Sequence, residues 1–490
     1  MFRVLLFLLF FTSIVQTSQG AYDVNQNCKD AWMLLMDLRI REAKQIITNE
    51  IINNPENYYA YYLDQTCDAY ALIINSNESD YEDFLDDYDK RREIMDDKDV
   101  DSPYYLACLS EMQLQVGIFN ILNGSHLSGL RKAYSSYKNA YRNLDKYPDF
   151  KQSLKLDGFF NVAISNVPPF VKWAVSFFGV SANPEYGFKT LYDNYETQKE
   201  IEGINAESAL YIILTAKINK TPELVYDFTH SLDSSVSQTF IHKYFKANIA
   251  YRTGKNEEAL AIMQQININN YPYVDIIYSY LMGKILLRKL DGNAGYYILR
   301  YLENLQKDEY VKEMNYKLAL VSLIEGNRLK YTEYCGIVQN EGKDINERDR
   351  EALYDASLDY FPDVNLVKAR ILIDGGYIEK AEIELQKFDN NADNLLVYKL
   401  EYLFLNAKLF TETGNKHIAI NKFKEVIDLG ENEDYYFASE AALRLANIYE
   451  SKGENELAKK YFSKSIKLYK NNYYEYIEDK AVKGLKRVGG

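Results

Sequence analysis

Apolar and small residues recur along the chain at one fixed spacing, which is the clearest pattern in the sequence. The unit has six positions at successive offsets of three, four, five, four and three residues, and a glycine usually occupies the third position. Offsets of three and four place residues on one face of a helix. A glycine ends a helix because it adopts a left-handed turn without steric cost. Each unit therefore predicts two helices joined by a tight turn.

Seven stretches of the chain carry this unit. Four keep both the glycine and a small residue five positions after it: Ala247 to Ile266, Ala369 to Phe388, Ala407 to Val426, and Ala446 to Ser465. Weaker copies begin at Ala31, Gly283 and Ala319. A helical hairpin cannot bury its apolar face alone, so the copies must stack on one another. The pattern predicts an all-α chain of stacked hairpins.

The step from one copy to the next resembles that of the tetratricopeptide repeat, whose period is about 34 residues. From Ala259 to Ala458, the fourth positions of successive units are 36, 36, 50, 38 and 39 residues apart. The resemblance implies an α-solenoid of tetratricopeptide-like hairpins that forms a right-handed superhelix. The 50-residue step predicts an added segment around residues 346–362.

Residues 1–20 have the three-part layout of a secretory signal. A basic residue precedes an unbroken apolar run over residues 4–11, and Ser18 and Gly20 are small residues before a cut at Ala21. The charge-free run is about twelve residues long, short of the roughly 20 that span a bilayer. We expect export to the periplasm or cell surface of a bacterial envelope, with no transmembrane span after the signal is removed.

The rest of the chain divides into three segments. Residues 21–155 are predicted to form N-terminal helical repeats, residues 156–200 an apolar helical junction, and residues 201–490 the repeat array. Pro168 and Pro169 interrupt the apolar run of the junction, so it is too short to span a bilayer. We expect a helix buried in the core there. Peripheral association with a membrane surface is the alternative.

Residues 76–101 are rich in aspartate and glutamate, which is typical of a solvated helix face and loop. Three alternating aspartates near the end of this segment resemble the start of a calcium loop. However, Ser102 stands where that loop needs a glycine, and Cys108 stands where it needs the closing glutamate. The segment is therefore not predicted to be an EF-hand.

The junction also resembles a known family. Its pair of prolines, an aromatic helix ending in Phe178-Gly179, and the run Tyr186-Gly187-Phe188 are similar to the signature of the tetratricopeptide-repeat thirty-nine and inclusion-body-clearance family of eukaryotes. Residues 129–137 and the tail from Ala458 to Leu485 resemble that family as well. The resemblance implies an all-helical, non-enzymatic adaptor that is sometimes membrane-associated. Those proteins resemble cytosol-facing factors, whereas this chain opens with an export signal.

The charge balance narrows the class of partner. The chain has 57 Lys and Arg against 71 Asp and Glu, a formal net charge of −14. A nucleic-acid binder needs a basic face, so we expect no nucleic-acid partner. The four cysteines form no CxxC pair, which favours single buried helix cysteines. One disulfide among Cys28, Cys67 and Cys108 is the alternative.

No motif predicts catalysis, a metal or a cofactor. The four histidines form no HExxH pair. Residues 336–344 read GIVQNEGKD, with five residues between the glycines where a phosphate loop has four, and Asp344 replaces the hydroxyl that would reach magnesium. No GxSxG sequence occurs. We expect a protein that is not an enzyme and holds no cofactor.

Polar residues off the packing faces of two adjacent first helices are the candidate binding residues. First helices of stacked hairpins line a concave wall that commonly takes up extended peptides or partner helices. Tyrosine and arginine suit recognition because they offer rigid area with a polar end. The candidates are Tyr244, Asn248, Tyr251, Arg252, Tyr280, Lys284 and Arg288. An ordinary solvated face with partly packed tyrosines is the alternative.

These observations predict a non-enzymatic exported scaffold that binds a protein or peptide in its concave groove. A glycan-binding component of an outer-membrane uptake system is the alternative, although the chain has only two tryptophans and no lipid-attachment sequence before Cys28. A helical-repeat enzyme acting on glycans or peptidoglycan is a third. The scaffold requires an electrostatically distinct groove across residues 241–290. The glycan binder requires flat exposed aromatic side chains, and the enzyme requires a closed pocket that contains carboxylates with perturbed pKa values.

Overall fold

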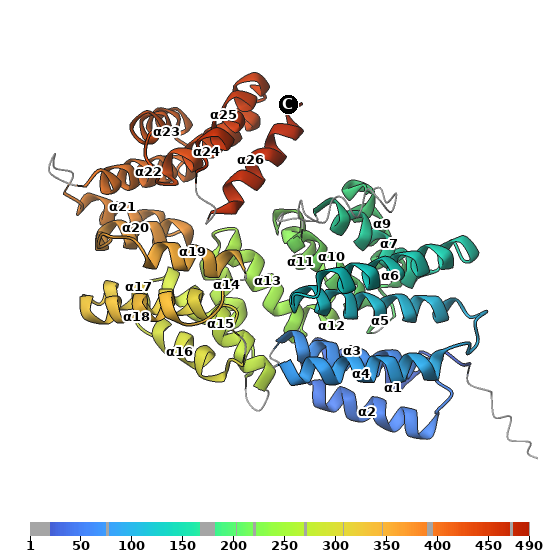
Figure 1. Ribbon diagram of the computed structural model, residues 1–490. Coiled ribbons are helices and arrows are strands. Elements are labelled where there is room, and N and C mark those ends of the chain that lie inside the picture. The colour runs from blue at the N-terminus through green and yellow to red at the C-terminus, as the bar shows by residue number, and fades with distance from the viewer. Residues whose placement is uncertain are drawn as a thin grey trace, which may run out of the picture. The chain divides into compact units, whose positions relative to one another are not determined.

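The computed structural model describes the chain in ten stretches: residues 20–74, 78–166, 182–201, 203–218, 222–268, 272–306, 308–344, 346–389, 395–470 and 474–489. Within these stretches the regular structure is helical throughout, and consecutive helices pack against each other in pairs (Figure 1). The expected all-α fold of stacked helical hairpins is confirmed. The predicted signal lies outside the described residues, apart from its last residue, Gly20.

The chain folds into two compact units. Unit 1 comprises residues 1–225 together with 232–239, and unit 2 comprises residues 226–231 together with 240–490. The three segments expected beyond the signal, which end at residues 155, 200 and 490, stay a prediction.

In the described part of unit 1, the helices pack in four pairs, α1 with α2, α3 with α4, α5 with α6, and α7 with α9, followed by α10. Their bounds are α1 Gln26–Met36, α2 Ile40–Asn53, α3 Tyr58–Ile74, α4 Glu78–Met95, α5 Pro103–Leu122, α6 His126–Lys146, α7 Lys151–Ala163, α9 Pro184–Gln198, α10 Ile204–Ile218 and α12 Ser234–Ser237, with 3-10 turns η1 Ile164–Asn166 and η2 Pro222–Val225.

The described residues of unit 2 form six hairpins, an added helix, α19, between the third and the fourth, and a last described helix, α26, packed on the sixth. The bounds are α11 Tyr226–Ser231, α13 Phe240–Arg252, α14 Asn256–Met263, α15 Pro272–Arg288, α16 Ala294–Asn304, α17 Val311–Ile324, α18 Arg328–Asn340, α19 Glu347–Ala356, α20 Val364–Asp374, α21 Ile378–Gln386, α22 Leu396–Glu412, α23 Lys416–Gly430, α24 Phe437–Ser451, α25 Asn455–Leu468 and α26 Glu475–Arg487. The segment added around residues 346–362 is thus α19 and the stretch that follows it.

Each of the seven repeated units coincides with one hairpin, and its third position is the turn. That residue has a positive φ in every copy: Leu38 (53°), Gly254 (76°), Leu290 (58°), Gly326 (81°), Gly376 (79°), Gly414 (79°) and Gly453 (75°). The small residue of the second helix is fully buried in the four stronger copies, at Ala259, Ala381, Ala419 and Ala458. Close approach of the two helices at this residue explains why it is small.

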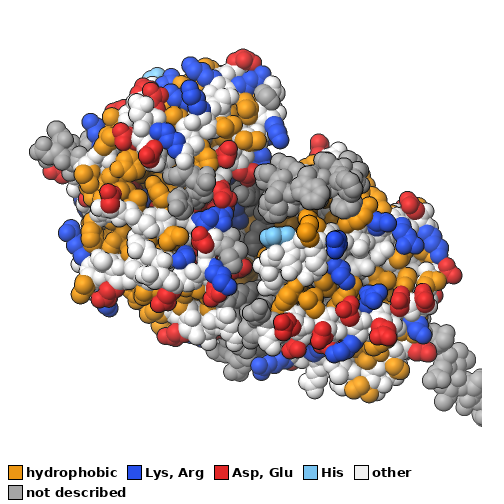
Figure 2. All heavy atoms as spheres, viewed as in Figure 1, with side chains coloured by type: hydrophobic (Ala, Val, Ile, Leu, Met, Phe, Trp, Pro, Cys, Tyr) orange, Lys and Arg blue, Asp and Glu red, His pale blue; other side chains and the backbone are white. Residues whose placement is uncertain are grey.

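The acidic segment forms α4 and the turn after it. Phe84, Tyr88 and Met95 of α4 are buried, while most of its acidic side chains are exposed. On the face that Figure 2 shows, acidic side chains gather where Figure 1 places α4. The predicted solvated helix face is confirmed.

Only part of the apolar junction can be compared with its prediction, because residues 167–181 lie outside the described residues. On either side of that stretch, α7 and α9 cross closely. A β-carbon on Gly158 would lie 2.9 Å from the carbonyl oxygen of Gly187. In the described ranges, no helix combines the length and apolar character needed to cross a membrane.

All four cysteines are buried and unpaired, so the expected single helix cysteines are confirmed over a disulfide. Burial raises the pKa of the Cys28 and Cys67 thiols to about 12. These thiols are therefore protonated and unreactive at neutral pH.

Candidate partner-binding site

Two of the candidate residues stack on each other across the first two hairpins of unit 2. The guanidinium carbon of Arg288 on α15 lies 3.5 Å from the centre of the Tyr251 ring on α13. The same guanidinium donates a hydrogen bond to the carbonyl oxygen of Tyr251. Lys284, one turn earlier on α15, lies 5.8 Å from the centre of that ring. The Tyr251 ring is thus flanked by two cations.

Lys284 and a further candidate, Tyr280, both contact a carboxylate of the third hairpin of unit 2. The Lys284 ammonium donates to the hydroxyl of Tyr280 at 2.9 Å and to Glu313 of α17 at 2.7 Å, and the Tyr280 hydroxyl donates to the second oxygen of Glu313 at 2.7 Å. The Glu313 side chain is 5% exposed. Burial would raise its pKa, but Lys284, Lys317 and Arg348 hold that pKa at about 2. Glu313 is therefore ionised at neutral pH.

The remaining candidates lie beside this cluster. Tyr244 is partly buried against Phe240 and Phe245, with ring centres 6.2 and 5.4 Å apart. Asn248 is half-buried and Arg252 is exposed on α13. The structure thus brings together Tyr251, Tyr280, Lys284 and Arg288, whereas Tyr244 is mainly a packing residue.

Sequence reasoning missed the residues that α17 and α19 contribute. Glu313 and Lys317, one turn apart on α17, form an ion pair at 3.7 Å. The candidates were chosen at the same positions in two neighbouring repeats, those that begin at Ala247 and Gly283. Glu313 and Lys317 occupy other positions in the repeat that begins at Ala319, so that comparison did not find them. The sequence did contain one indication of these residues, because a glutamate and a lysine four positions apart in a helix can form an ion pair.

Helix α19 is fixed to the start of α17 beside this cluster. The Asp349 carboxylate accepts hydrogen bonds from the backbone N–H groups of Tyr310 and Glu313 at 2.7 and 2.9 Å. Burial raises the pKa of Asp349 to about 6, although these N–H groups favour its charged form. The added segment therefore orders the helix that carries Glu313.

Charges continue along the first helices of the later hairpins. Lys408 of α22 pairs with Asp374 of α20 at 2.6 Å, and Arg370 of α20 lies 3.6 Å from Glu401 of α22. Arg444 pairs with Glu440 within α24 at 2.7 Å. These first helices therefore present alternating charges, most of which have a partner.

A separate cavity of about 580 Å³ lies between α14 and α16, at the end of α15. Tyr296, Gln264 and Asn293 contribute aromatic and polar groups to its wall, and Leu260 and Met282 line its base. The Tyr296 side chain is 57% exposed. Over the described residues, no group of three or more histidine, cysteine or carboxylate side chains is placed to hold a metal ion.

Unit 1 has a buried charge cluster in its core. Lys155 of α7, which is 2% exposed, lies 2.8 Å from Glu111 of α5 and donates a hydrogen bond to Glu207 of α10. The Tyr211 hydroxyl donates to Glu111 at 2.5 Å. Burial would lower the pKa of Lys155, but the two carboxylates raise it, and burial raises the pKa of Glu207. We interpret the role of this cluster as structural, because it links α5, α7 and α10 in the core of unit 1.

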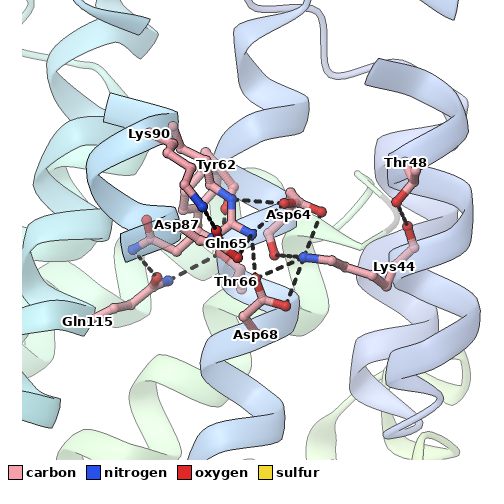
Figure 3. A network of polar contacts seen from close by, with 11 residues as sticks. Lys44, Thr48, Tyr62, Asp64, Gln65, Thr66, Asp68, Asp87, Lys90 and Gln115 are labelled. Atoms are coloured by element: carbon pink, nitrogen blue, oxygen red, sulfur yellow. Dashed lines mark hydrogen bonds and ion pairs between the residues drawn. The ribbon is translucent and has the colours of Figure 1, made fainter. Parts of the chain in front are cut away.

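A second polar network joins α2, α3 and α4 (Figure 3). Lys44 of α2 reaches Asp64 and Asp68 of α3 at 2.8 and 2.7 Å. Arg91 of α4 donates to the same two carboxylates, to Asp64 at 2.8 Å. The Arg91 side chain is 8% exposed and that of Lys44 is 33% exposed. The network holds the acidic helix α4 against the rest of unit 1.

The chain shows similarity to a chain of the crystal structure of the APC/C hetero-tetramer Cut9-Hcn1, with 10% identity, coverage of 95% of this chain and 97% of that chain, and a TM-score of 0.23. No curated protein matches the sequence. A family model described as tetratricopeptide repeat matches residues 439–472, which span the hairpin of α24 and α25. The chain therefore contains a tetratricopeptide repeat, and the same spacing of residues recurs in six of the other described hairpins.

Proposed function

We propose that this protein is an exported, non-enzymatic scaffold that binds a protein or peptide along the first helices of unit 2. The observation that carries the proposal is the cluster of Tyr251, Tyr280, Lys284 and Arg288. These side chains come from neighbouring helices, remain partly accessible, and combine aromatic area with charge. Such groups dominate the binding energy of protein interfaces.

Two further observations support a binding role. A tetratricopeptide repeat at residues 439–472 is a module that generally mediates protein interactions. The lysine, tyrosine and carboxylate groups at the site hold one another in place through hydrogen bonds of 2.7 to 2.9 Å. A site that is ordered before binding loses less side-chain entropy when the partner arrives. The export part of the proposal rests on the layout of residues 1–20.

Site-directed photocrosslinking in the cells that naturally make the protein tests this proposal. A photoreactive residue in place of Asn248 is expected to capture one reproducible envelope protein, identified by mass spectrometry. Changing both Tyr251 and Arg252 to alanine is expected to abolish that capture. The matched control carries the photoreactive residue in place of exposed Lys330 on α18 and is expected not to capture the same protein. Equal capture from both positions, or capture of polysaccharide at Asn248, would contradict the proposal.

A second candidate function, glycan binding, is favoured by the cavity between α14 and α16. Sugars bind against exposed aromatic faces flanked by hydrogen-bonding groups, and Tyr296, Gln264 and Asn293 supply both. A glycan array probed with the full chain and with a Tyr296→Ala variant distinguishes the two functions. Glycan binding that Tyr296→Ala removes would favour the sugar site, and an array without signal would leave the protein-binding function.

A further inference from the structure

The cluster around Tyr251 has more positive than negative charge. Lys284, Arg288 and Lys317 supply three cations, and Glu313 is the carboxylate that Lys284 and Lys317 contact. Among the described residues, Arg288 forms no ion pair within 4.0 Å. Two positive charges at this cluster are therefore not balanced by Glu313.

Neighbouring carboxylates offset this excess only in part. Arg288 helps to lower the pKa of Asp374, and Lys317 acts on Asp355, but each of these carboxylates also faces a cation from outside the cluster. Asp374 pairs with Lys408 at 2.6 Å, and Glu351 pairs with Arg348 at 2.9 Å. The cations also act on Tyr251 itself. Burial would raise the pKa of the Tyr251 hydroxyl, but Arg288, Lys284 and Lys317 lower that pKa below its usual value. A negative charge is thus favoured at the position of this hydroxyl.

Hydrogen-bond donors at the cluster also lack acceptors. The Tyr251 hydroxyl donates to no other described residue, and the Lys317 ammonium contacts Glu313 only at 3.7 Å. Arg288 uses one N–H group for the carbonyl oxygen of Tyr251, which leaves other N–H groups of its guanidinium available within the described part of unit 2. The Tyr251 hydroxyl, the Lys317 ammonium and the Arg288 guanidinium are therefore three donor groups with spare hydrogen-bonding capacity, and both cations act on the Tyr251 hydroxyl.

We propose that this cluster binds a phosphate monoester, presented by a phosphorylated peptide that lies along the first helices of unit 2. A phosphate monoester carries about −1.5 to −2 charge at pH 7 and three terminal acceptor oxygens. These properties match the excess of positive charge and the three donor groups, whereas a single carboxylate offers one charge and two oxygens. The inference rests on the proposed function, since it names the chemistry of that partner.

The accessibility of the cluster favours a peptide over a membrane surface. The side chains of Lys284 and Lys317 are 11% and 21% exposed. A slender side chain can reach such recessed groups, but a flat bilayer contacts the most protruding residues first. A lipid phosphate is therefore a competing outcome of the test.

Isothermal titration of the full chain with a capped phosphoserine pentapeptide of otherwise alanine residues tests the proposal. The unphosphorylated peptide is expected to bind at least about tenfold more weakly, because charge-assisted hydrogen bonds are lost. Lys317→Gln is expected to weaken binding of the phosphopeptide about tenfold, and Tyr251→Phe about threefold. Tyr251→Phe retains the ring under Arg288, so it tests the hydroxyl without removing the stacking. Lys330→Gln, at an exposed lysine of α18, is the matched control and is expected to change nothing.

Three outcomes would overturn the inference. The two peptides could bind equally, the Lys317 and Tyr251 variants could bind like the unchanged chain, or inorganic phosphate could bind as tightly as the phosphopeptide. Capture by vesicles that contain phosphatidic acid, dependent on Lys317 and without phosphopeptide binding, would assign the site to lipid. A crosslinked protein partner without phosphopeptide binding would keep the proposed function and remove this inference. Phosphopeptide binding without any crosslinked protein would keep the phosphate site and remove the envelope protein as its partner.

Discussion

A β-carbon on Gly376 would lie 2.3 Å from the carbonyl oxygen of Gly254, so the turns made by these two glycines are packed backbone against backbone. The first turn joins α20 to α21 and the second joins α13 to α14. Beside them, the Tyr377 hydroxyl accepts a hydrogen bond from Asn256 at 2.9 Å. This contact brings the fourth hairpin of unit 2 against the first, next to the cluster around Tyr251.

We expect Gly376→Ala to destabilise the protein by about 2 to 5 kcal/mol. The left-handed backbone costs an alanine about 1 to 2 kcal/mol, and the overlap with Gly254 adds a packing cost of about 1 to 3 kcal/mol. Gly414→Ala is the matched control, because Gly414 has the same φ of 79° and nothing within 4 Å of the added carbon. Urea unfolding measures both. Equal losses would show that the contact between the two turns does not contribute.

Lys155→Met is expected to cost about 3 to 5 kcal/mol, because it leaves two carboxylates buried without a cation. The loss is expected to shrink between pH 8 and pH 5, since burial raises the pKa of Glu207 and a protonated carboxyl no longer needs a partner. Urea unfolding at both pH values gives the two free energies. Lys189→Met is the control: Lys189 pairs with Asp193 on the surface, where its side chain is 74% exposed, and we expect a change below about 0.5 kcal/mol. A loss that is independent of pH would contradict this account.

Removing Arg91 is expected to destabilise unit 1 more than removing Lys44, although both contact Asp64 and Asp68. The Arg91 side chain is only 8% exposed, so Arg91→Leu leaves the carboxylates of Asp64 and Asp68 without their buried partner. We expect this change to lower the free energy of unfolding by about 2 to 3 kcal/mol. Lys44 is 33% exposed, so Lys44→Leu is expected to cost below about 1 kcal/mol, and less in high salt. Thermal unfolding of the two variants at low and high salt checks this order. The reverse order would show that Lys44 is the main partner of these carboxylates.

Glu351 of α19 is expected to make unit 2 less stable as the pH rises. Burial raises its pKa from 4.5 to about 7, so between these values the folded chain binds more protons than the unfolded chain. Its contribution therefore favours folding at low pH and is lost as the pH rises towards 7. Glu351→Gln removes this dependence, and at pH 8 we expect the variant to gain up to about 3 kcal/mol relative to the unchanged chain. Urea unfolding from pH 4 to pH 8 measures the difference, and parallel curves for the two proteins would exclude this role.

The hairpins could be predicted from the sequence because their causes are local. The spacing from Ala446 to Ser465 fixes which residues share a helical face and where the chain turns, and α24 and α25 follow directly. The same register located turns at Leu38 and Leu290, where no glycine is present and the backbone is nevertheless left-handed. Local rules of helix periodicity and turn geometry are sufficient for this level of structure.

The candidate site was predicted only in part. Tyr251 and Arg288 were selected because they lie off the packing faces of two neighbouring first helices. The two side chains do stack on each other across these hairpins. The same offsets selected Tyr244, which packs against aromatic rings. They missed Glu313, which lies at a different position within its unit, although its carboxylate accepts a hydrogen bond from Lys284.

The sequence by itself determined that this chain is a series of helical hairpins, where the seven repeated hairpins turn, and which residue of the second helix is small in the four stronger copies. Only the tertiary structure decided which charges meet. Lys155 is paired by Glu111 and Glu207 from two other helices, and Asp349 of the added helix α19 binds the start of α17. The physical reason is that the two kinds of interaction act over different separations along the chain. Helix periodicity acts over three or four residues, whereas an ion pair between distant segments forms only after the packing of whole helices has fixed their positions.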